Sequence, residues 1–340
     1  MTANTQAENN TAVTGKADDQ KGRQIQADWA AHEKTSPMYF LETFTKALSS
    51  GNADLKPICI PTGFSNLDEA LGGGFHEGVT VIGAISSIGK STLIAQVADQ
   101  IAKTGRSVIF FTLEESQRKL VYKSISRETA YYAEQNGISG KDFARKAREV
   151  ADTTKYAGYT DLGREVIDGA IEAYSKYAGN LFIYENTDGK GIARVREAVK
   201  THTDYTGSTP VVIIDYLQVL ASFTNRASDK QNLDKAIMEL TEISKDFMVP
   251  VIAISSLNRH SYNEPVTMTS FKESGNIEYG ADVLIGMQLK GVGVKGFNST
   301  AEKGKNPRNV ELTIIKNRDY EVDANIKFSY YTEHNYFREI

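Results

Sequence analysis

The chain has 340 residues, 40% hydrophobic and 24% charged, which is ordinary for a soluble protein and leaves room for one large α/β domain plus extensions. No apolar run approaches the roughly 20 residues that span a bilayer, and the polar N-terminus has no signal-peptide core, so we expect a cytoplasmic protein with no membrane partner. Cys59 is the only cysteine, which excludes an internal disulfide and a cysteine zinc cluster. The net charge of −4 argues against a broadly basic surface, although a few Lys and Arg residues lining a channel suffice to bind nucleic acid.

The N-terminal part of the chain is polar and then amphipathic. Residues 1–35 are rich in Asn, Thr, Gln, Ala, Asp and Lys and cannot bury enough surface to offset their ordering entropy, so we expect a disordered tail. Ser36-Pro37 indicates a helix start, and apolar residues follow at helical spacing: Met38, Phe40, Leu41, Phe44 and Leu48. This helix, within residues 36–55, needs a cover for its apolar side, which either its own domain or a neighbouring subunit provides.

Apolar, strand-like runs alternate with helical patterns across residues 56–340. The expected strands are 79–83, 107–113, 181–185, 211–215, 249–255, 282–289 and 310–315. Such alternation predicts an α/β fold with a doubly wound, mostly parallel sheet flanked by helices. Ligands of such sheets bind beyond the C-terminal ends of the strands, so polar residues at those ends are the candidates for chemistry.

The segment from Gly83 to Thr92 predicts a phosphate-binding loop, because it follows an apolar strand, contains Gly89-Lys90-Ser91 and precedes a helix. The N–H groups of such a loop point at phosphates, a lysine at the position of Lys90 reaches the outer phosphates, and a serine at that of Ser91 holds a magnesium ion. Ala84 stands at the first loop position, which is tolerated where φ is negative. The residues expected to bind a nucleoside triphosphate are Ala84, Ser86, Ser87, Ile88, Gly89, Lys90, Ser91 and Thr92.

Two further apolar strands end in carboxylates. Asp215 ends the strand 211–215, where phosphate-loop ATPases carry a second magnesium-anchoring acid. Glu114 follows the strand 107–113 and is placed to polarise an attacking water. Glu115 is an alternative base, but strand alternation points the two glutamates in different directions, so only one of them serves.

Two other strand ends are less specific. Ser255 and Ser256 either sense a γ-phosphate or cap a turn, and both interpretations stay open. Lys316 and Arg318 project to the same side of an extended segment, from which they could reach a neighbouring chain's triphosphate as arginine-finger-type groups. From spacing alone, a solvated charged turn is the favoured interpretation of these two cations.

Taken in order, these segments resemble the ATPase domain of DnaB-type replicative helicases, which has a RecA-like fold. The resemblance runs from about residue 36 to residue 335, and its Asp-Tyr-Leu-Gln and Glu-Ser-Gly segments are more specific than Pro-Thr-Gly and Gly-Gly-Gly, which RadA- and KaiC-like relatives share. The segments are Pro61-Thr62-Gly63, Leu71-Gly72-Gly73-Gly74, the phosphate loop, Thr112-Leu113-Glu114, Asp215-Tyr216-Leu217-Gln218, Ser255-Ser256-Leu257-Asn258-Arg259, Glu273-Ser274-Gly275 with Ala281-Asp282, and Lys316-Asn317-Arg318.

The resemblance implies an ATP-dependent DNA translocase or helicase: a hexameric ring with single-stranded DNA in its channel, ATP and Mg²⁺ between subunits, and a primase, a loader or another replication protein as candidate partners. It gives Glu114 the activation of water and Asp215 the support of the metal. It raises Lys316 and Arg318 from a charged turn to fingers that reach the adjacent subunit's nucleotide, and it makes the helix within 36–55 a linker that docks on a neighbouring subunit. The residues that it turns toward DNA are Arg226, Lys230, Asn258, Arg259 and Lys272.

The sequence also departs from the family pattern. A polar tail stands where the family has an N-terminal collar domain, Ser256 where it usually has Gln, Lys272 where it usually has Arg, and Asp319-Tyr320 where a Gly usually follows the finger motif. These departures keep an alternative open: a RecA- or KaiC-like ATPase that acts as a recombination mediator, loader or scaffold without unwinding. Hydrolysis that is indifferent to DNA, or filaments in place of rings, would favour this alternative.

Overall fold

The computed structural model of the chain describes residues 23–29, 32, 36–50, 58–140, 143–221, 229–257, 262–271, 275–320 and 322–340. The chain divides into two units, Met1–Pro57 and Ile58–Ile340, and each is described by itself. Within the described ranges, no helix is both long enough and apolar enough to cross a membrane.

The first unit contains the helix α2, Pro37–Ser50, so the helix start predicted at Ser36-Pro37 is confirmed. The hydroxyl of Ser36 accepts a hydrogen bond from the backbone N–H of Met38 at 3.3 Å, as a helix-capping side chain does. The apolar side chains of α2 that are exposed are Met38, Leu41, Phe44 and Leu48. Of the tail predicted for residues 1–35, the structure describes 23–29 and 32, which are helical, and the rest lies outside the described residues.

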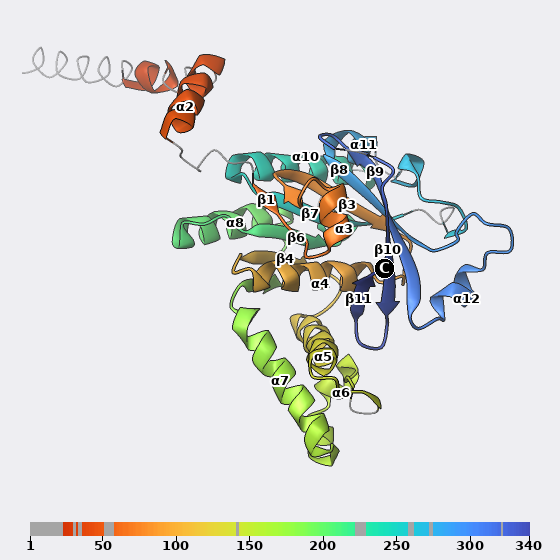
Figure 1. The fold of residues 1–340 in the computed structure, drawn as a ribbon. Helices are drawn as coiled ribbons and strands as arrows, with labels where there is room; N and C mark the ends of the chain where they lie inside the picture. Colours follow the sequence, from red (N-terminus) through yellow and green to blue (C-terminus); the bar gives the residue numbers. More distant parts are fainter. Residues whose placement is uncertain are drawn as a thin grey trace, which may run out of the picture. The chain divides into compact units, whose positions relative to one another are not determined.

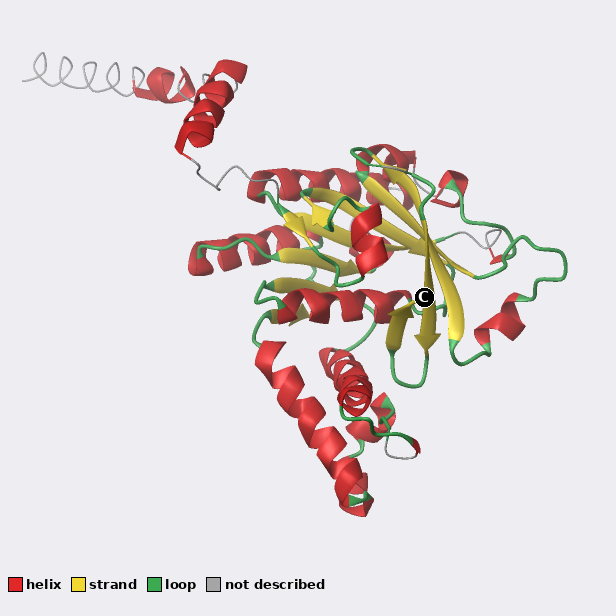
Figure 2. Cartoon of the chain, viewed as in Figure 1, coloured by secondary structure: helices red, strands yellow, loops and turns green. Residues whose placement is uncertain are grey.

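The second unit is built on one sheet, in which nine of the described strands lie in the order β11-β10-β9-β8-β3-β7-β6-β4-β5 (Figure 2). Strands β8, β3, β7, β6, β4 and β5 are parallel, and β9, β10 and β11 continue the sheet antiparallel beyond β8. The doubly wound, mostly parallel sheet predicted from the sequence is confirmed. The bounds are β3 Gly78–Ala84, β4 Val108–Thr112, β5 Leu181–Tyr184, β6 Val211–Asp215, β7 Pro250–Ser256, β8 Val283–Leu289, β9 Arg308–Asn317, β10 Asn325–Tyr331 and β11 Tyr336–Glu339, with a separate antiparallel pair of β1 Cys59–Ile60 and β2 Phe75–His76.

Helices flank the sheet. Since each crossover between parallel strands is right-handed, its direction along the sheet decides which face its helix covers. The crossover from β3 outward to β4 carries α4, whereas those that return from β5 to β6 and from β6 to β7 carry α8 and α10, so these helices lie on opposite faces (Figure 1). The main helices are α4 Lys90–Lys103, α5 Gln117–Gln135, α7 Asp161–Ala178, α8 Ile192–Thr206 and α10 Asp229–Phe247. The shorter ones are α3 Ser65–Ala70, α6 Ala147–Ala151, α9 Leu217–Ala221, α11 Gly275–Gly280 and α12 Ser299–Lys303, with 3₁₀ turns η3 Thr153–Gly158 and η5 Met268–Phe271.

The central strands are apolar along their whole length because helices cover both of their faces. In β6, every residue from Val211 to Ile214 is fully buried, and the apolar residues of β3 and β7 are buried as well. This buried sheet fixes the positions of the loops at its carboxyl edge.

The antiparallel strands β10 and β11 are a correction to the sequence analysis, which expects no strand after residue 315. Their signal is alternation rather than an apolar run: Ile326, Phe328 and Tyr330 are buried, and the residues between them are more exposed. At the end of β11, the carboxylate of Glu339 accepts the backbone N–H groups of Asn66 and Leu67 at 3.1 Å each, which satisfies free donors at the start of α3.

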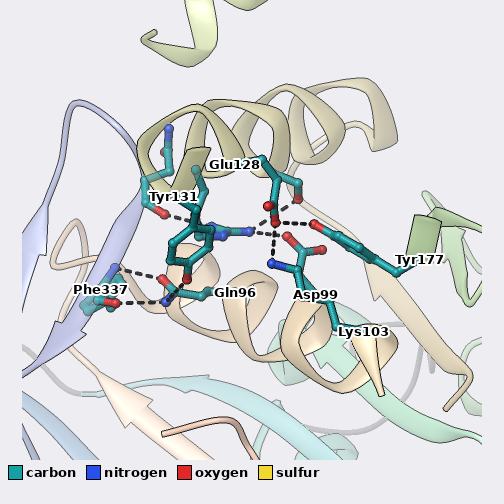
Figure 3. Close-up of polar contacts among 10 residues, drawn as sticks. Gln96, Asp99, Lys103, Glu128, Tyr131, Tyr177 and Phe337 are labelled. Atoms are coloured by element: carbon teal, nitrogen blue, oxygen red, sulfur yellow. Dashed lines mark hydrogen bonds and ion pairs between the residues drawn. The ribbon is translucent and has the colours of Figure 1, made fainter. Parts of the chain in front are cut away.

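A buried ion pair joins α4 to α5 (Figure 3). Asp99 of α4 and Arg127 of α5 lie 2.5 Å apart, and the two residues are 3% and 0% exposed. Arg127 also donates to the carbonyl of Asn335 at 2.7 Å. Because water does not reach these groups, each depends on its partners, and the pairing fixes α5 against α4.

Further polar contacts hold α4 at two other places (Figure 3). One turn beyond Asp99, Lys103 pairs with Glu128 at 2.6 Å, and Glu128 also accepts the hydroxyl of Tyr177 of α7 at 2.8 Å. Toward β11, the amide of Gln96 donates to the carbonyl of Phe337 at 2.8 Å and accepts its N–H at 2.7 Å. The helix that begins at Lys90 is therefore anchored to α5, α7 and β11.

Candidate functional site

The carboxyl ends of four neighbouring strands form the candidate site. Strands β3, β7, β6 and β4 are adjacent in that order. Ala84 at the end of β3 lies beside Ser256 of β7, and Thr112 of β4 lies beside Asp215 of β6. The structure therefore brings together, at one edge of the sheet, the strand ends from which the phosphate loop, Glu114, Asp215 and Ser256 were predicted to act.

The loop between β3 and α4 has the backbone of a phosphate cradle. Ser86 and Ser87 are exposed at its tip, and Ile88 is buried beneath it. Ser87 and Gly89 have positive φ angles of 64° and 111°, and left-handed residues next to helical ones turn successive N–H groups toward a common point. A Cβ on Gly89 would lie 2.7 Å from the ring of Tyr330, so backbone conformation and space both require glycine there.

Lys90, the first residue of α4, spans the mouth of this loop. Its ammonium donates to the carbonyl of Ala84 and to the hydroxyl of Ser256, at 3.3 Å each. Burial lowers the pKa of Lys90, and the negative charges of Asp215 and Glu114 oppose that shift. A cation held at this point, with acidic groups around it, is suited to the outer phosphates of a nucleotide.

The other residues predicted to bind nucleotide occupy three kinds of position. Ala84 ends β3, where the extended backbone suits alanine. Thr92 is 5% exposed and its hydroxyl lies 3.4 Å from that of Tyr330, so its side chain packs inside the domain. Ser91 is partly exposed and lies close enough to Asp215 to influence its pKa. The loop backbone, Lys90 and Ser91 are thus the parts of the predicted set that face the site.

Asp215 is a buried carboxylate without a hydrogen-bond partner. It is 1% exposed, and neither of its oxygens is hydrogen-bonded among the residues that the structure describes. Burial raises the pKa of Asp215 to about 6, the nearby Ser91 hydroxyl opposes this shift, and Glu114 adds to it. The folded protein thus keeps an acid at this strand end at an electrostatic cost, which a bound cation would relieve.

This arrangement fits a magnesium ion. Mg²⁺ prefers oxygen ligands and is usually held by one or two protein groups plus water and phosphate oxygens. Asp215 and Ser91 provide that pair, and within the described ranges no group of three or more His, Cys, Asp or Glu could hold a metal by itself. The residues present therefore fit an ion that arrives with a nucleotide.

The structure separates the two glutamates that compete for the role of base. Both oxygens of Glu115 accept from the ammonium of Lys123, at 2.7 and 2.5 Å. Glu114 is exposed; both glutamates raise the pKa of Asp215, but of the two Glu114 is the one that raises the pKa of Lys90. Glu114 therefore faces the phosphate loop, whereas Glu115 is held by the first turns of α5.

The two serines at the end of β7 also differ. Ser255 is 1% exposed, and its hydroxyl accepts from the amide of Gln218 at 2.9 Å, so it joins β7 to the segment after β6. Ser256 is exposed and bonded to Lys90. Of the pair, Ser256 faces the site.

Two residues near the loop were not predicted. The hydroxyl of Tyr262 lies 2.7 Å from that of Ser86, and the guanidinium of Arg308 donates to the carbonyl of Ser87 at 2.8 Å and to the carbonyl of Lys303. Arg308 also lies over the ring of Tyr330, 5.7 Å from its centroid. No local pattern identifies either residue, because each reaches the loop from a distant part of the chain.

Lys316 and Arg318 lie at the opposite edge of the sheet from their own phosphate loop. Leu284, near the start of β8, pairs with Lys316 of the antiparallel β9, and the backbone N–H of Arg318 donates to the carbonyl of Asp282 at 3.2 Å. Lys316 donates to the carbonyls of Glu278 and Ala281, both at 2.6 Å. The start of β8 adjoins the start of β3, so neither cation is near the Lys90 of its own chain.

Of the residues predicted to face DNA, Lys230 is described, and it is an exposed residue of the first turn of α10. The others lie outside the described residues: Arg226, Asn258, Arg259 and Lys272.

Comparison with known proteins gives one consistent answer. Residues 59–339 match the family described as the DnaB-like helicase C-terminal domain. The chain is 26% identical over 274 residues to a "Probable replicative DNA helicase" of Trieres chinensis, covering 78% of this chain and 54% of that protein. It is 24% identical over 286 residues to the "Replicative DNA helicase DnaC" of Bacillus subtilis (strain 168), covering 82% of this chain and 56% of that protein. The chain thus spans little more than half the length of these curated relatives.

Solved structures agree on the fold. A solved ATPase domain matches 90% of this chain and 99% of its own, with a TM-score of 0.72 and 20% identity. A DnaB-like replicative helicase, from a study of its interactions with primase, matches 89% of this chain and 66% of its own, with a TM-score of 0.67 and 20% identity. The RecA-like fold implied by the sequence resemblance is confirmed.

Proposed function

Because the chain belongs to the family of DnaB-like helicase C-terminal domains, we propose that it is an ATP-driven motor that moves on single-stranded DNA in replication. The observation that carries the nucleotide-binding part of this proposal is the buried Asp215 at the foot of a phosphate loop, whose oxygens have no hydrogen bond of normal geometry among the described residues and whose charge the nearby Ser91 hydroxyl supports. Burying a carboxylate without a strong partner is costly for a residue with a purely structural role. A site for magnesium and nucleotide needs such a carboxylate, and the bound ion would be its partner.

In the proposed reaction, the loop N–H groups and Lys90 bind the phosphates of ATP, and Ser91 and Asp215 hold the accompanying Mg²⁺. A bound Mg²⁺ supplies neutralisation of the phosphate charge. Glu114 accepts the proton of the attacking water, because it is the strand-end carboxylate that lies close to Lys90 and is not held by Lys123. Such a base contributes about 10²- to 10⁴-fold to the rate.

The position of Arg318 supports a ring in which each site is completed by a neighbour. Arg318 and Lys316 lie at the edge of the sheet away from their own Lys90, so they can stabilise charge only in a second subunit's site. An arginine supplied in this way contributes roughly 10³ to 10⁵ in rate in related phosphoryl-transfer enzymes. A hexamer, with α2 docked through its exposed apolar residues on an adjacent subunit, is the assembly that we propose.

The DNA-binding residues proposed for this motor are Arg226, Lys230, Asn258, Arg259 and Lys272. The segments that contain them follow β6 and β7, the strands that end in Asp215 and Ser256. A phosphate-dependent shift at those strand ends would therefore move the DNA contacts directly. A primase or a loader remains the proposed class of protein partner.

The test is ATP hydrolysis with and without single-stranded DNA, with Lys90→Ala as the blank. Strong stimulation by DNA, absent from the blank, is the expected result, and unwinding of a forked duplex would follow. Hydrolysis that is indifferent to DNA would overturn the motor and favour a mediator or a scaffold. If the wild-type protein binds no ATP, the nucleotide site itself is wrong.

A further inference from the structure

Tyr262 occupies a fixed position above the phosphate loop. It begins the described segment 262–271, which packs over the ends of β3 and β8. The backbone N–H of Val266 donates to the amide oxygen of Gln288 at 2.9 Å. The ring of Phe271 lies so close to Gly83 that a Cβ there would approach it to 2.2 Å. The segment that carries Tyr262 is thus tied to the strand from which the loop springs.

The hydroxyl of Tyr262 lies among the groups that surround the outer phosphates in the proposed site. It is 2.7 Å from the hydroxyl of Ser86, at the exposed tip of the loop. Tyr262 also opposes the effect of burial on the pKa of Lys90, after Asp215 and Glu114. The ammonium of Lys303 lies over the ring, 4.8 Å from its centroid, and helps to hold it.

The end of β7 carries only a short polar side chain toward the site. Its last residue is Ser256, whose short side chain is already engaged by Lys90 at 3.3 Å. The amide of Gln218 lies behind it, 2.9 Å from the hydroxyl of Ser255. A group that reaches beyond Lys90 toward a terminal phosphate must therefore be longer than serine, and the phenol of Tyr262 has that length and a hydroxyl donor at its tip.

We propose that the Tyr262 hydroxyl binds the terminal phosphate of ATP and so distinguishes ATP from ADP. The inference rests on the proposed ATP site. In the structure the hydroxyl is paired with Ser86. When ATP binds, it exchanges this neutral partner for a charged phosphate oxygen, which is the stronger acceptor. Because Ser86 is exposed, its hydroxyl can then bond to water or to the phosphates, so no buried hydroxyl is left unpaired.

This assignment gives the segment after β7 a direct link to the nucleotide. Tyr262 lies between the residues proposed to contact DNA, Asn258 and Arg259 on one side and Lys272 on the other. Loss of the terminal phosphate would release the hydroxyl to Ser86 and relax the hold on the whole segment. Tyr262 is thus a nucleotide-sensing residue on the element that the proposed motor has to move.

The experiment compares Mg²⁺-ADP with a Mg²⁺-bound non-hydrolysable ATP analogue in the full chain, by equilibrium binding. Tyr262→Phe keeps the ring and its contact with Lys303 and removes only the hydroxyl. We expect the variant to bind the analogue roughly tenfold or more weakly and ADP as the wild type does, since a hydrogen bond to a charged group is lost for one ligand alone.

Two further variants separate sensing from support of the loop. Ser86→Ala removes the partner that the hydroxyl has without nucleotide and with ADP, so we expect it to raise the affinity for the analogue relative to that for ADP, the opposite direction from Tyr262→Phe. Tyr205→Phe, at a 91% exposed tyrosine, controls for the loss of a phenol and should match the wild type. Equal weakening of both nucleotides by Tyr262→Phe, or no weakening, would overturn the role of Tyr262 while the ATP site stands. Failure of the wild type to bind either nucleotide would overturn the proposed function as well.

Discussion

Arg318 is paired with Asp282 of its own chain, Nη1 to Oδ1 at 3.0 Å, on the edge of the sheet that faces away from Lys90. Its other terminal nitrogen donates to the carbonyl of Tyr279 at 2.7 Å. The side chain of Arg318 is half exposed, and such surface pairs contribute about 0–1 kcal/mol. The guanidinium can therefore leave Asp282 at little cost, as its proposed role in a neighbouring subunit's site requires.

Arg318→Ala should abolish hydrolysis without weakening ATP binding, because the guanidinium acts in another subunit's site. The decisive measurement mixes two inactive proteins. Arg318→Ala subunits keep Lys90, and Lys90→Ala subunits keep Arg318, so mixed assemblies contain some complete interfaces and should regain part of the activity. Normal hydrolysis by Arg318→Ala alone, or mixtures that stay inactive under conditions in which subunits exchange, would contradict the assignment in trans.

Glu114→Gln should lower kcat by roughly 10²- to 10⁴-fold and leave nucleotide affinity unchanged, as expected for loss of a general base. Glu115→Gln is the matched control, since Glu115 is bonded to Lys123 rather than turned to the site. We expect it to retain most of the wild-type kcat. Single-turnover hydrolysis measures both, and a larger loss for Glu115→Gln would exchange their roles.

Asp215→Asn should make the nucleotide-free protein more stable while it abolishes Mg²⁺-dependent hydrolysis. The pKa of Asp215 is raised from 3.8 to about 6 by burial, which corresponds to about 3 kcal/mol against the ionised form. Between these two values the folded state binds more protons than the unfolded state, so this carboxylate costs most above pH 6 and nothing well below pH 3.8. Urea unfolding in EDTA gives the free energy of unfolding across this range.

The difference in stability between Asp215→Asn and the wild type should therefore be largest at pH 7.5, about half as large near pH 5, and small at pH 4. Saturating Mg²⁺ and ATP should reverse its sign, because ligands that bind only the wild-type folded state stabilise it. A difference that stays constant with pH would show that Asp215 is not buried in its charged form.

Asp99→Leu should lower the free energy of unfolding by about 3–5 kcal/mol, because it leaves the charge of Arg127 buried without its partner. The double variant Asp99→Leu/Arg127→Met should recover part of this loss. It should not reach the wild type, since Arg127 also satisfies the carbonyl of Asn335. Denaturant unfolding of the three proteins tests the pair, and a single variant within 1 kcal/mol of the wild type would contradict it.

The parallel half of the fold could be predicted because its strands are continuous apolar runs. Val211–Ile214 is such a run, and it is fully buried as expected. Strand β10 was missed because it alternates Ile326, Phe328 and Tyr330 with polar residues, a pattern that the search for apolar runs does not find. The prediction therefore stopped where the sheet changes from parallel to antiparallel.

In the site, residues that belong to a local sequence pattern could be predicted, and residues that reach the site from distant parts of the chain could not. Lys90 could be identified because strand, loop and helix are consecutive in sequence. Tyr262 and Arg308 could not, since they meet Ser86 and Ser87 across 176 and 221 residues. Strand alternation alone could not choose between Glu114 and Glu115, because the difference lies in the contact of Glu115 with Lys123; the family resemblance had pointed to Glu114.

The charges buried between α4 and α5 also determine where this domain can bend. An apolar interface can slide by exchanging one apolar contact for another, but separating the Asp99 carboxylate from Arg127 would leave two charges in a dry interior. The junction therefore resists sliding, and we expect α4 and α5 to move together as one unit. Any displacement of Lys90, at the start of α4, would then be transmitted to α5 instead of being absorbed between the two helices.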